Sequence, residues 1–153
     1  MLCILTQRGP MQIPGAGMMQ PVADFNGAYT QFQGVVSKPK PVQDGGVPII
    51  VGGHSEAAAR RAGRQGDGFY PLGVDLEGMA SLRGVMEKEA LKVGRDPAAV
   101  EITMGGIADA DQVARFQDAG VGRILLFPTS GDLDVLRSQL EPFAKDAIAR
   151  FSS

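Results

Sequence analysis

The stretch VPIIVGGHSEAAARRAGRQGDGFYP, Val47–Pro71, decides the fold of this chain. Its apolar, β-branched run Ile49–Val51 is typical of a buried parallel strand. Two glycines end this run, and Ser55 then stands at a favourable helix N-cap position. Strong helix formers follow, and Gly66 lies where helices commonly end. The stretch therefore predicts a strand, a glycine turn, a helix and the beginning of a second strand.

The glycine turn also has the chemistry of an anion site. Gly52 and Gly53 leave the backbone bare, and the first N–H groups of a helix have no partner within that helix. A phosphate group accepts hydrogen bonds from such N–H groups. The alternative is an ordinary strand-to-helix turn that needs its glycines for geometry alone. The order of the glycines is not G-x-G-x-x-G, so the dinucleotide-binding fingerprint is not met.

Four short motifs lie in and beside this stretch: PKPVQ at 39–43, PIIVGG at 48–53, ARRA at 59–62 and GDGF at 66–69. In this order and spacing the chain resembles the luciferase-like monooxygenase superfamily, and most closely its deazaflavin-dependent branch, the coenzyme F-420 oxidoreductases. The resemblance covers about residues 24–150 and only the second half of the family's domain. It implies that the complete domain is a (β/α)8 barrel.

The remainder of the chain repeats the alternation of strand and helix. Apolar residues at spacings of three and four predict a helix over about 75–93, and further strands are expected at 101–104 and 123–127. A last apolar stripe covers 133–151, where Pro142 is expected either to interrupt the helix or to start its second half. We therefore predict an α/β fold with about four parallel strands and outer helices. A doubly wound sheet would use the same alternation, and the resemblance favours the C-terminal half of a (β/α)8 TIM-type barrel.

We expect the whole chain, 1–153, to form a single partial luciferase-like barrel domain. Within it, residues 1–46 are an irregular N-terminal excursion and residues 47–153 carry the βα units. In the excursion, residues 1–8 suit either the end of a helix or a strand, 8–21 suit an irregular loop, and 23–36 suit a short hairpin.

Composition narrows the function classes. A net charge of −2 gives no electrostatic case for nucleic-acid binding. No stretch approaches the roughly 20 apolar residues of a membrane span. A single cysteine excludes an internal disulfide and fits a reducing compartment. We therefore expect a cytoplasmic protein without nucleic-acid or membrane partners. A small-molecule substrate is what the resemblance implies.

The candidate cofactor-binding residues gather at the glycine turn. His54 is the only histidine and follows the glycine pair at the end of a strand, where barrel enzymes place their sites. Its ring either contacts the phosphate or tail of a cofactor or lies in solvent beside the helix cap. The sequence identifies no catalytic residue, and one histidine with one cysteine does not make a usual zinc site. The predicted cofactor-binding set is Gly52, Gly53, His54 and Ser55.

Two further turns are expected at the same rim, Gly105-Gly106 after the third strand and Thr129–Gly131 after the fourth. They suit either a phosphate site of the kind that late barrel loops form or plain turn chemistry. Asp67 precedes a strand, at the opposite end of the sheet. It is interpreted as a capping or structural residue.

What the resemblance implies about function is a flavin-type oxidoreductase. Such an enzyme transfers a hydride between a bound deazaflavin, coenzyme F-420, and an unknown small organic substrate. One alternative is an FMN-dependent luciferase-like monooxygenase. Another is a non-catalytic half barrel that acts as an assembly partner or is a truncation product.

A half barrel leaves two open sheet edges and an inner face without its usual neighbours. The chain is therefore expected to be a fragment of a longer protein, to form a homo-oligomer, or to pair with a missing N-terminal half. The apolar residues expected on the inner face are Ile49, Val51, Ile102, Met104, Leu125 and Phe127.

Overall fold

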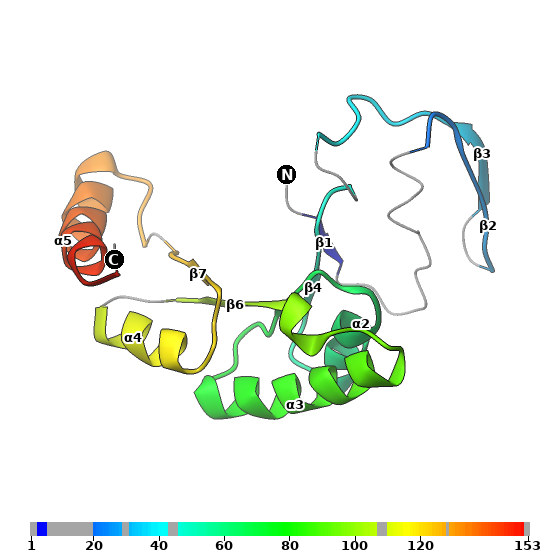
Figure 1. The fold of residues 1–153 in the computed structure, drawn as a ribbon. Helices are drawn as coiled ribbons and strands as arrows, with labels where there is room; N and C mark the ends of the chain where they lie inside the picture. Colours follow the sequence, from blue (N-terminus) through cyan, green and yellow to red (C-terminus); the bar gives the residue numbers. More distant parts are fainter. Residues whose placement is uncertain are drawn as a thin grey trace.

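A computed structural model describes residues 3–5, 20–28, 31–42, 46–106, 110–127 and 129–151. Its centre is a five-stranded sheet in the order β1-β4-β5-β6-β7 (Figure 1). Every strand pairs with its neighbours in parallel. The strands are β1 (Cys3–Leu5), β4 (Ile49–Gly52), β5 (Gly68–Tyr70), β6 (Glu101–Gly105) and β7 (Arg123–Leu125).

This sheet confirms the predicted α/β class and contains one strand more than expected. The additional strand is β1, which pairs with β4 in the register Cys3↔Ile49 to Leu5↔Val51. A run of three residues is too short for a periodic signal, so the sequence left helix and strand open here. Most of the loop expected at 8–21 lies outside the described residues.

In the described residues, four α-helices follow strands of the sheet. They are α2 (Glu56–Gln65), α3 (Leu76–Lys92), α4 (Ala110–Asp118) and α5 (Leu133–Phe151), with a 3-10 turn η1 at Pro97–Ala99. Asp75 caps α3 by accepting a hydrogen bond from the Gly78 N–H at 2.8 Å. Pro142 lies inside α5, which is one helix from Leu133 to Phe151, so of the two alternatives the interruption is wrong. Because α5 is largely exposed, water can bond the carbonyl that Pro142 leaves free. Among the helices of the described residues, none has both the length and the apolar character that a bilayer crossing needs.

A separate hairpin confirms the prediction for 23–36. Strands β2 (Ala23–Asn26) and β3 (Gln31–Val35) pair antiparallel and form their own two-stranded sheet. The rings of Phe25 and Phe32 stack across the pair with centroids 5.6 Å apart. The Asp24 carboxylate accepts a hydrogen bond from the Gly34 N–H at 2.7 Å.

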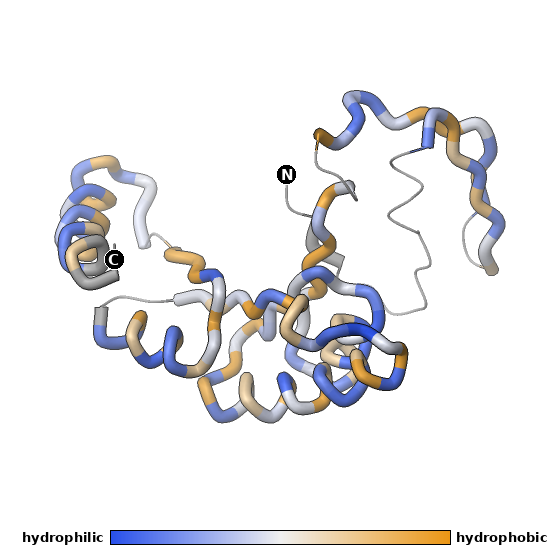
Figure 2. The backbone as a smooth tube through the Cα atoms, viewed as in Figure 1, coloured by the Kyte–Doolittle hydropathy of each residue, from blue (hydrophilic) through white to orange (hydrophobic). Residues whose placement is uncertain are grey.

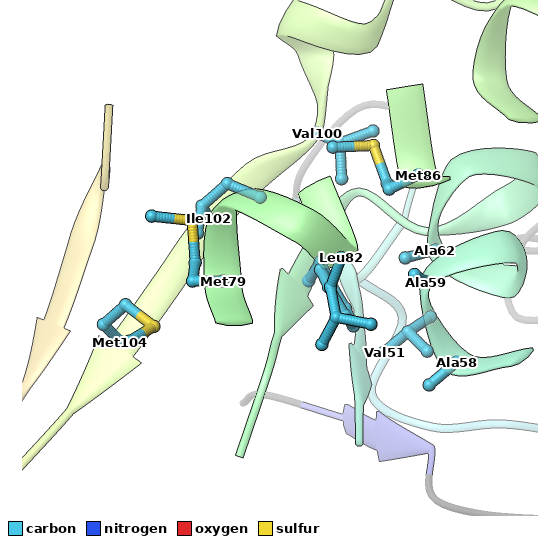
Figure 3. Packing of buried hydrophobic residues seen from close by; sticks show 11 residues of the cluster. Val51, Ala58, Ala59, Ala62, Met79, Leu82, Met86, Val100, Ile102 and Met104 are labelled. Atoms are coloured by element: carbon cyan, nitrogen blue, oxygen red, sulfur yellow. The ribbon is translucent and has the colours of Figure 1, made fainter. Parts of the chain in front are cut away.

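The core lies between the sheet and the pair α2 and α3 (Figure 3). Val51, Ile102 and Met104 belong to this cluster and are 3% exposed each, so their expected place on the inner face is wrong. Successive strand residues point to opposite faces, and the helices cover the face on which these three side chains lie. The other members of the cluster are Ala58, Ala59, Ala62, Phe69, Met79, Leu82, Met86 and Val100.

Helices α2 and α3 approach each other closely at Gly63. A Cβ atom built on this residue would lie 2.3 Å from the Met86 carbonyl oxygen and 3.0 Å from the Ala90 nitrogen. Beyond this contact, the Arg95 guanidinium donates to the carbonyl oxygens of Gly63 at 2.9 Å and Gly66 at 2.8 Å. Arg95 thus satisfies carbonyl groups at the end of α2 that have no partner within the helix.

Asp67 joins the beginnings of three strands, as the structural interpretation predicted. Its carboxylate accepts from the Ile49 N–H at 2.8 Å. Its own N–H donates to the Ile49 carbonyl, and its carbonyl accepts from the Glu101 N–H at 3.0 Å. One residue therefore links β4, β5 and β6 at the edge opposite the glycine turn.

The contact at Gly63 gives a first prediction. Gly63→Ala places a methyl group against the backbone of α3, and we expect the free energy of unfolding to fall by about 1–3 kcal/mol. The matched control is Gly84→Ala in α3, where the new Cβ meets nothing within 4 Å. Helix propensity should make that variant neutral or up to about 1 kcal/mol more stable. Urea unfolding measures both, and equal effects would show that Gly63 is not a packing contact.

A second prediction concerns Thr103 in the middle of β6. It is 2% exposed, and among the described residues its Oγ1 has no hydrogen-bond partner. A buried hydroxyl without a partner costs about 1–3 kcal/mol. Thr103→Val, which removes the hydroxyl and keeps the shape of the side chain, should therefore raise the unfolding midpoint. The matched control Thr103→Ser keeps the hydroxyl and loses a methyl group, so it should not raise the midpoint. A midpoint that falls in Thr103→Val would contradict this.

Candidate functional site

The glycine turn connects β4 to α2 at the C-terminal edge of the sheet. Gly52 is buried as the last residue of β4. The Gly53 N–H donates to the Tyr70 carbonyl at 3.1 Å, which ties the turn to the end of β5. Gly53 has a φ of +137°, a region that side chains rarely adopt. A Cβ at Gly53 would also lie 2.9 Å from the Ala58 Cβ, so glycine is required here on two counts.

The helix that follows is capped and open to solvent at its start. Ser55 is the N-cap residue, and its hydroxyl accepts from the Ala58 N–H at 3.3 Å. The Ala58 and Ala59 N–H groups donate to the Ser55 carbonyl. The N–H groups of Glu56 and Ala57 precede these bonds and have no acceptor within the helix. His54 and Ser55 are both exposed, so the structure brings the four predicted residues together on an accessible turn.

Charged side chains of α2 form ion pairs with one another and with α3. Glu56 pairs with Arg60 at 2.5 Å one turn along the helix. Arg64 pairs with Glu89 of α3 at 3.4 Å. A hydrogen bond from Lys92 is the main cause that lowers the pKa of Glu89, and this group belongs to the α2–α3 contact. Any attraction for an anion at the turn therefore comes from backbone N–H groups and the helix dipole.

The other expected rim turns lie at the same edge. The Gly106 N–H donates to the Leu125 carbonyl at 3.1 Å, so the end of β6 joins the end of β7. The Thr129 hydroxyl accepts from Gln139, and the Ser130 hydroxyl accepts from the Asp132 N–H at 3.1 Å. Both hydroxyl groups thus take part in the turn that leads into α5.

Sequence reasoning missed two aromatic side chains that lie against Gly105 beside this edge. A Cβ at Gly105 would lie 2.7 Å from the Phe127 ring and 2.8 Å from the Tyr70 hydroxyl oxygen. Gly105 therefore lets the two rings approach the backbone of β6 from the face opposite the helices. The available signal was that Tyr70 and Phe127 stand near the ends of two strands, β5 and β7. Only the order of the sheet shows that these strands lie on either side of β6 and its Gly105.

A hollow of about 390 Å³ lies near the rim, outside the glycine turn. It is lined by Asp75, Leu76, Glu77, Gly106, Gln112, Arg115 and Phe116. In the part of the chain that the structure describes, no three side chains of the His, Cys, Asp and Glu types gather as a metal site would require.

A sequence profile of luciferase-like monooxygenases matches residues 11–119. The chain belongs to the luciferase-like monooxygenase family. An uncharacterised protein of Mycobacterium tuberculosis is 28% identical to this luciferase-like chain over 136 residues. An uncharacterised protein of Mycobacterium bovis matches equally well. The match covers 83% of the chain and 46% of the relative, so the chain spans about half the length of these curated relatives.

Solved structures show the same fold. An F-420-dependent secondary alcohol dehydrogenase, in complex with an F-420–acetone adduct, has a TM-score of 0.67 at 16% identity over 83% of this chain and 56% of its own. The F-420-dependent tetrahydromethanopterin reductase of Methanopyrus kandleri has a TM-score of 0.54 at 15% identity over 88% of this chain and 40% of its own. These luciferase-like proteins are TIM barrels, and our chain matches part of them, as the resemblance implied.

Proposed function

We propose that this chain forms the phosphate-holding part of a flavin-type oxidoreductase that transfers a hydride between coenzyme F-420 and a small organic substrate. Members of the luciferase-like family are oxidoreductases or monooxygenases. Two solved barrels of the same fold act with coenzyme F-420. The observation that carries the proposal is the glycine turn, whose conformation leaves a capped helix start exposed at the C-terminal edge.

The residues of the turn fit a phosphate group. Gly53 offers no side chain where the anion would approach, and its φ of +137° sets the direction of the turn. Ser55 fixes the helix start by bonding the Ala58 N–H, which leaves the N–H groups before it for the ligand. The exposed His54 ring adds a donor beside them. These residues would bind a phosphate group chiefly through backbone N–H donors, without an arginine side chain.

When bound, the deazaflavin ring supplies the hydride chemistry. The part played by Gly52, Gly53, His54 and Ser55 is to hold the tail, so that the ring end is directed over the barrel mouth. The ring itself is positioned by loops from all around a barrel, and this chain supplies the loops that follow the later strands.

There are two alternative functions, of which the first uses the glycine turn and the second does not. An FMN-dependent luciferase-like monooxygenase would also place a phosphate there. A non-catalytic half barrel that serves as an assembly partner is favoured by one observation, the five strands where a closed barrel has eight.

The phosphate role predicts a difference between FMN and riboflavin, which lacks the phosphate. The chain should bind FMN more tightly than riboflavin, and Gly53→Ala should weaken FMN binding by about tenfold or more, because each lost hydrogen bond to a charged group is worth about 1.5–3 kcal/mol. Riboflavin binding should change little. Fluorescence titration measures both, and coenzyme F-420 is titrated in parallel.

The control is Gly94→Ala, which places a side chain at a φ of +73° with nothing within 4 Å. It also replaces a glycine at positive φ, without a clash like the one at Ala58, and it lies after α3. Circular dichroism checks that both variants fold. Equal affinity for FMN and riboflavin in the unaltered chain would refute the phosphate role.

A further prediction concerns turnover. The isolated chain should oxidise reduced coenzyme F-420 no faster than buffer does, since lost positioning of the reacting groups forfeits about 7–11 kcal/mol of barrier lowering. Absorbance of the reduced cofactor over time measures this, with a complete member of the family as the positive control. Robust, substrate-dependent turnover by residues 1–153 alone would show that they already build a whole site.

A further inference from the structure

The hairpin of β2 and β3 carries an exposed asparagine that is followed directly by a glycine. Asn26 is the last residue of β2, it is exposed, and it is the only asparagine of the chain. Gly27 follows it beyond the last pair of the hairpin ladder, Asn26↔Gln31. Figure 2 shows polar residues among apolar ones along the two strands. The Asn26 amide is therefore in reach of water and next to a residue outside the ladder.

Hydrogen bonds do not hold the two groups apart in the part of the chain that the structure describes. Within it, the Asn26 side-chain amide has no partner, and the Gly27 N–H donates to no carbonyl. The side chain two residues earlier shows the contrast, because the Asp24 carboxylate accepts from the Gly34 N–H at 2.7 Å. No contact of that kind keeps the Asn26 amide from turning toward the nitrogen of Gly27.

We propose that Asn26 is a modification site, at which the side-chain amide becomes a carboxylate through a cyclic imide without the help of an enzyme. The Gly27 nitrogen attacks Asn26 Cγ and forms a C–N bond to it. The bond between Cγ and the side-chain nitrogen breaks, and ammonia leaves with the proton of the Gly27 amide. Water then opens the imide at either of its carbonyl groups, which gives aspartate or isoaspartate. The whole reaction consumes one water molecule and releases one ammonia molecule.

Glycine at position 27 is what favours this attack. It has no Cβ to crowd the attacking nitrogen, and its backbone tolerates the rotation that brings this nitrogen to Cγ. Because strand pairing ends at Asn26, the rotation disturbs no pair of the ladder beyond Asn26↔Gln31. Asparagine is also among the thermally labile residues. The sequence and the position at a strand end therefore act in the same direction.

The fold blocks the equivalent reaction at Asp67-Gly68, where an aspartate would form the same imide. The Asp67 carboxylate accepts from the Ile49 N–H at 2.8 Å. Gly68 is buried in β5, which pairs with β4 on one side and with β6 on the other. Attack at this place would require the sheet to open. A third such pair, at 44–45, lies outside the described residues.

The product alters the hairpin in one of two ways. Aspartate places a new negative charge two residues from Asp24, and the net charge of the chain becomes more negative than −2. Isoaspartate adds a methylene group to the backbone, so the register that pairs Phe25 with Phe32 and Asn26 with Gln31 no longer fits. The stacking of the two phenylalanine rings depends on that register.

The test follows Asn26 in the intact chain. The purified protein is kept in mildly alkaline buffer made with heavy-oxygen water, either folded or unfolded in urea, and peptide mapping by mass spectrometry locates the heavy oxygen. We expect label at Asn26 in both samples, at rates within about tenfold of each other. A site that reacts only after global unfolding would be slower in the folded chain by a factor of about a thousand or more. Asp67 should gain label in urea alone.

Matched variants assign the mechanism. Gly27→Ala puts a Cβ beside the attacking nitrogen and should slow labelling at Asn26 at least about tenfold. Gly84→Ala, at an open position of α3, should leave the rate unchanged. Circular dichroism checks that both variants fold.

Two results would overturn the proposal. One is a folded chain that keeps its Asn26 amide while the sample in urea loses it. The other is labelling of Gly27→Ala at the rate of the unaltered chain, which would indicate direct hydrolysis without the imide. Neither measurement uses a cofactor, so the outcome is independent of the phosphate role of the glycine turn.

Discussion

A parallel sheet needs cover on both faces and partners at both edges, and this requirement governs the whole structure. The chain meets it on one face, where α2 and α3 pack on β4, β5 and β6 with side chains such as Phe69, Met79 and Met86 almost wholly buried. The close contact at Gly63 brings the two helices near enough to act as one layer. The buried core of the described residues therefore lies between the sheet and its outer helices.

The candidate site depends on this layer. Gly53 can hold its strained conformation because the turn is anchored at both ends, to the Tyr70 carbonyl in the sheet and to the Ser55 cap on α2. At the opposite edge Asp67 fixes the beginnings of the same strands. Since α2 is packed through Ala59 and Ala62, which are 0% exposed, its start cannot shift without disturbing the core. The conformation of the proposed cofactor-binding turn is therefore supported by the core.

The same packing explains the contrast between the two ends of the sheet. Burial is complete in β5 and fades to half-burial in β7, and α5 beyond it keeps only a few half-buried residues. The glycine turn follows the buried strand β4, while the exposed Phe127 follows the half-buried strand β7.

The sequence by itself determined the local elements, because their signals are local. Capping residues, glycine positions and apolar spacing were enough for the strands at 49–52, 68–70 and 101–105 and for the helices after them. They were also enough for the hairpin and for the four residues of the glycine turn. Only the tertiary structure decided which side chains of each strand face the helices. Alternation along a strand separates its residues into two faces but does not say which face the helices cover. Val51, Ile102 and Met104 therefore lie on the helix side, toward the outside of the barrel wall. The tertiary structure also decided the pairing of β1 with β4, the approach of Tyr70 and Phe127 to Gly105, and the continuation of α5 through Pro142. Each of these depends on residues far apart in the chain or on access to water, which no short window of sequence contains.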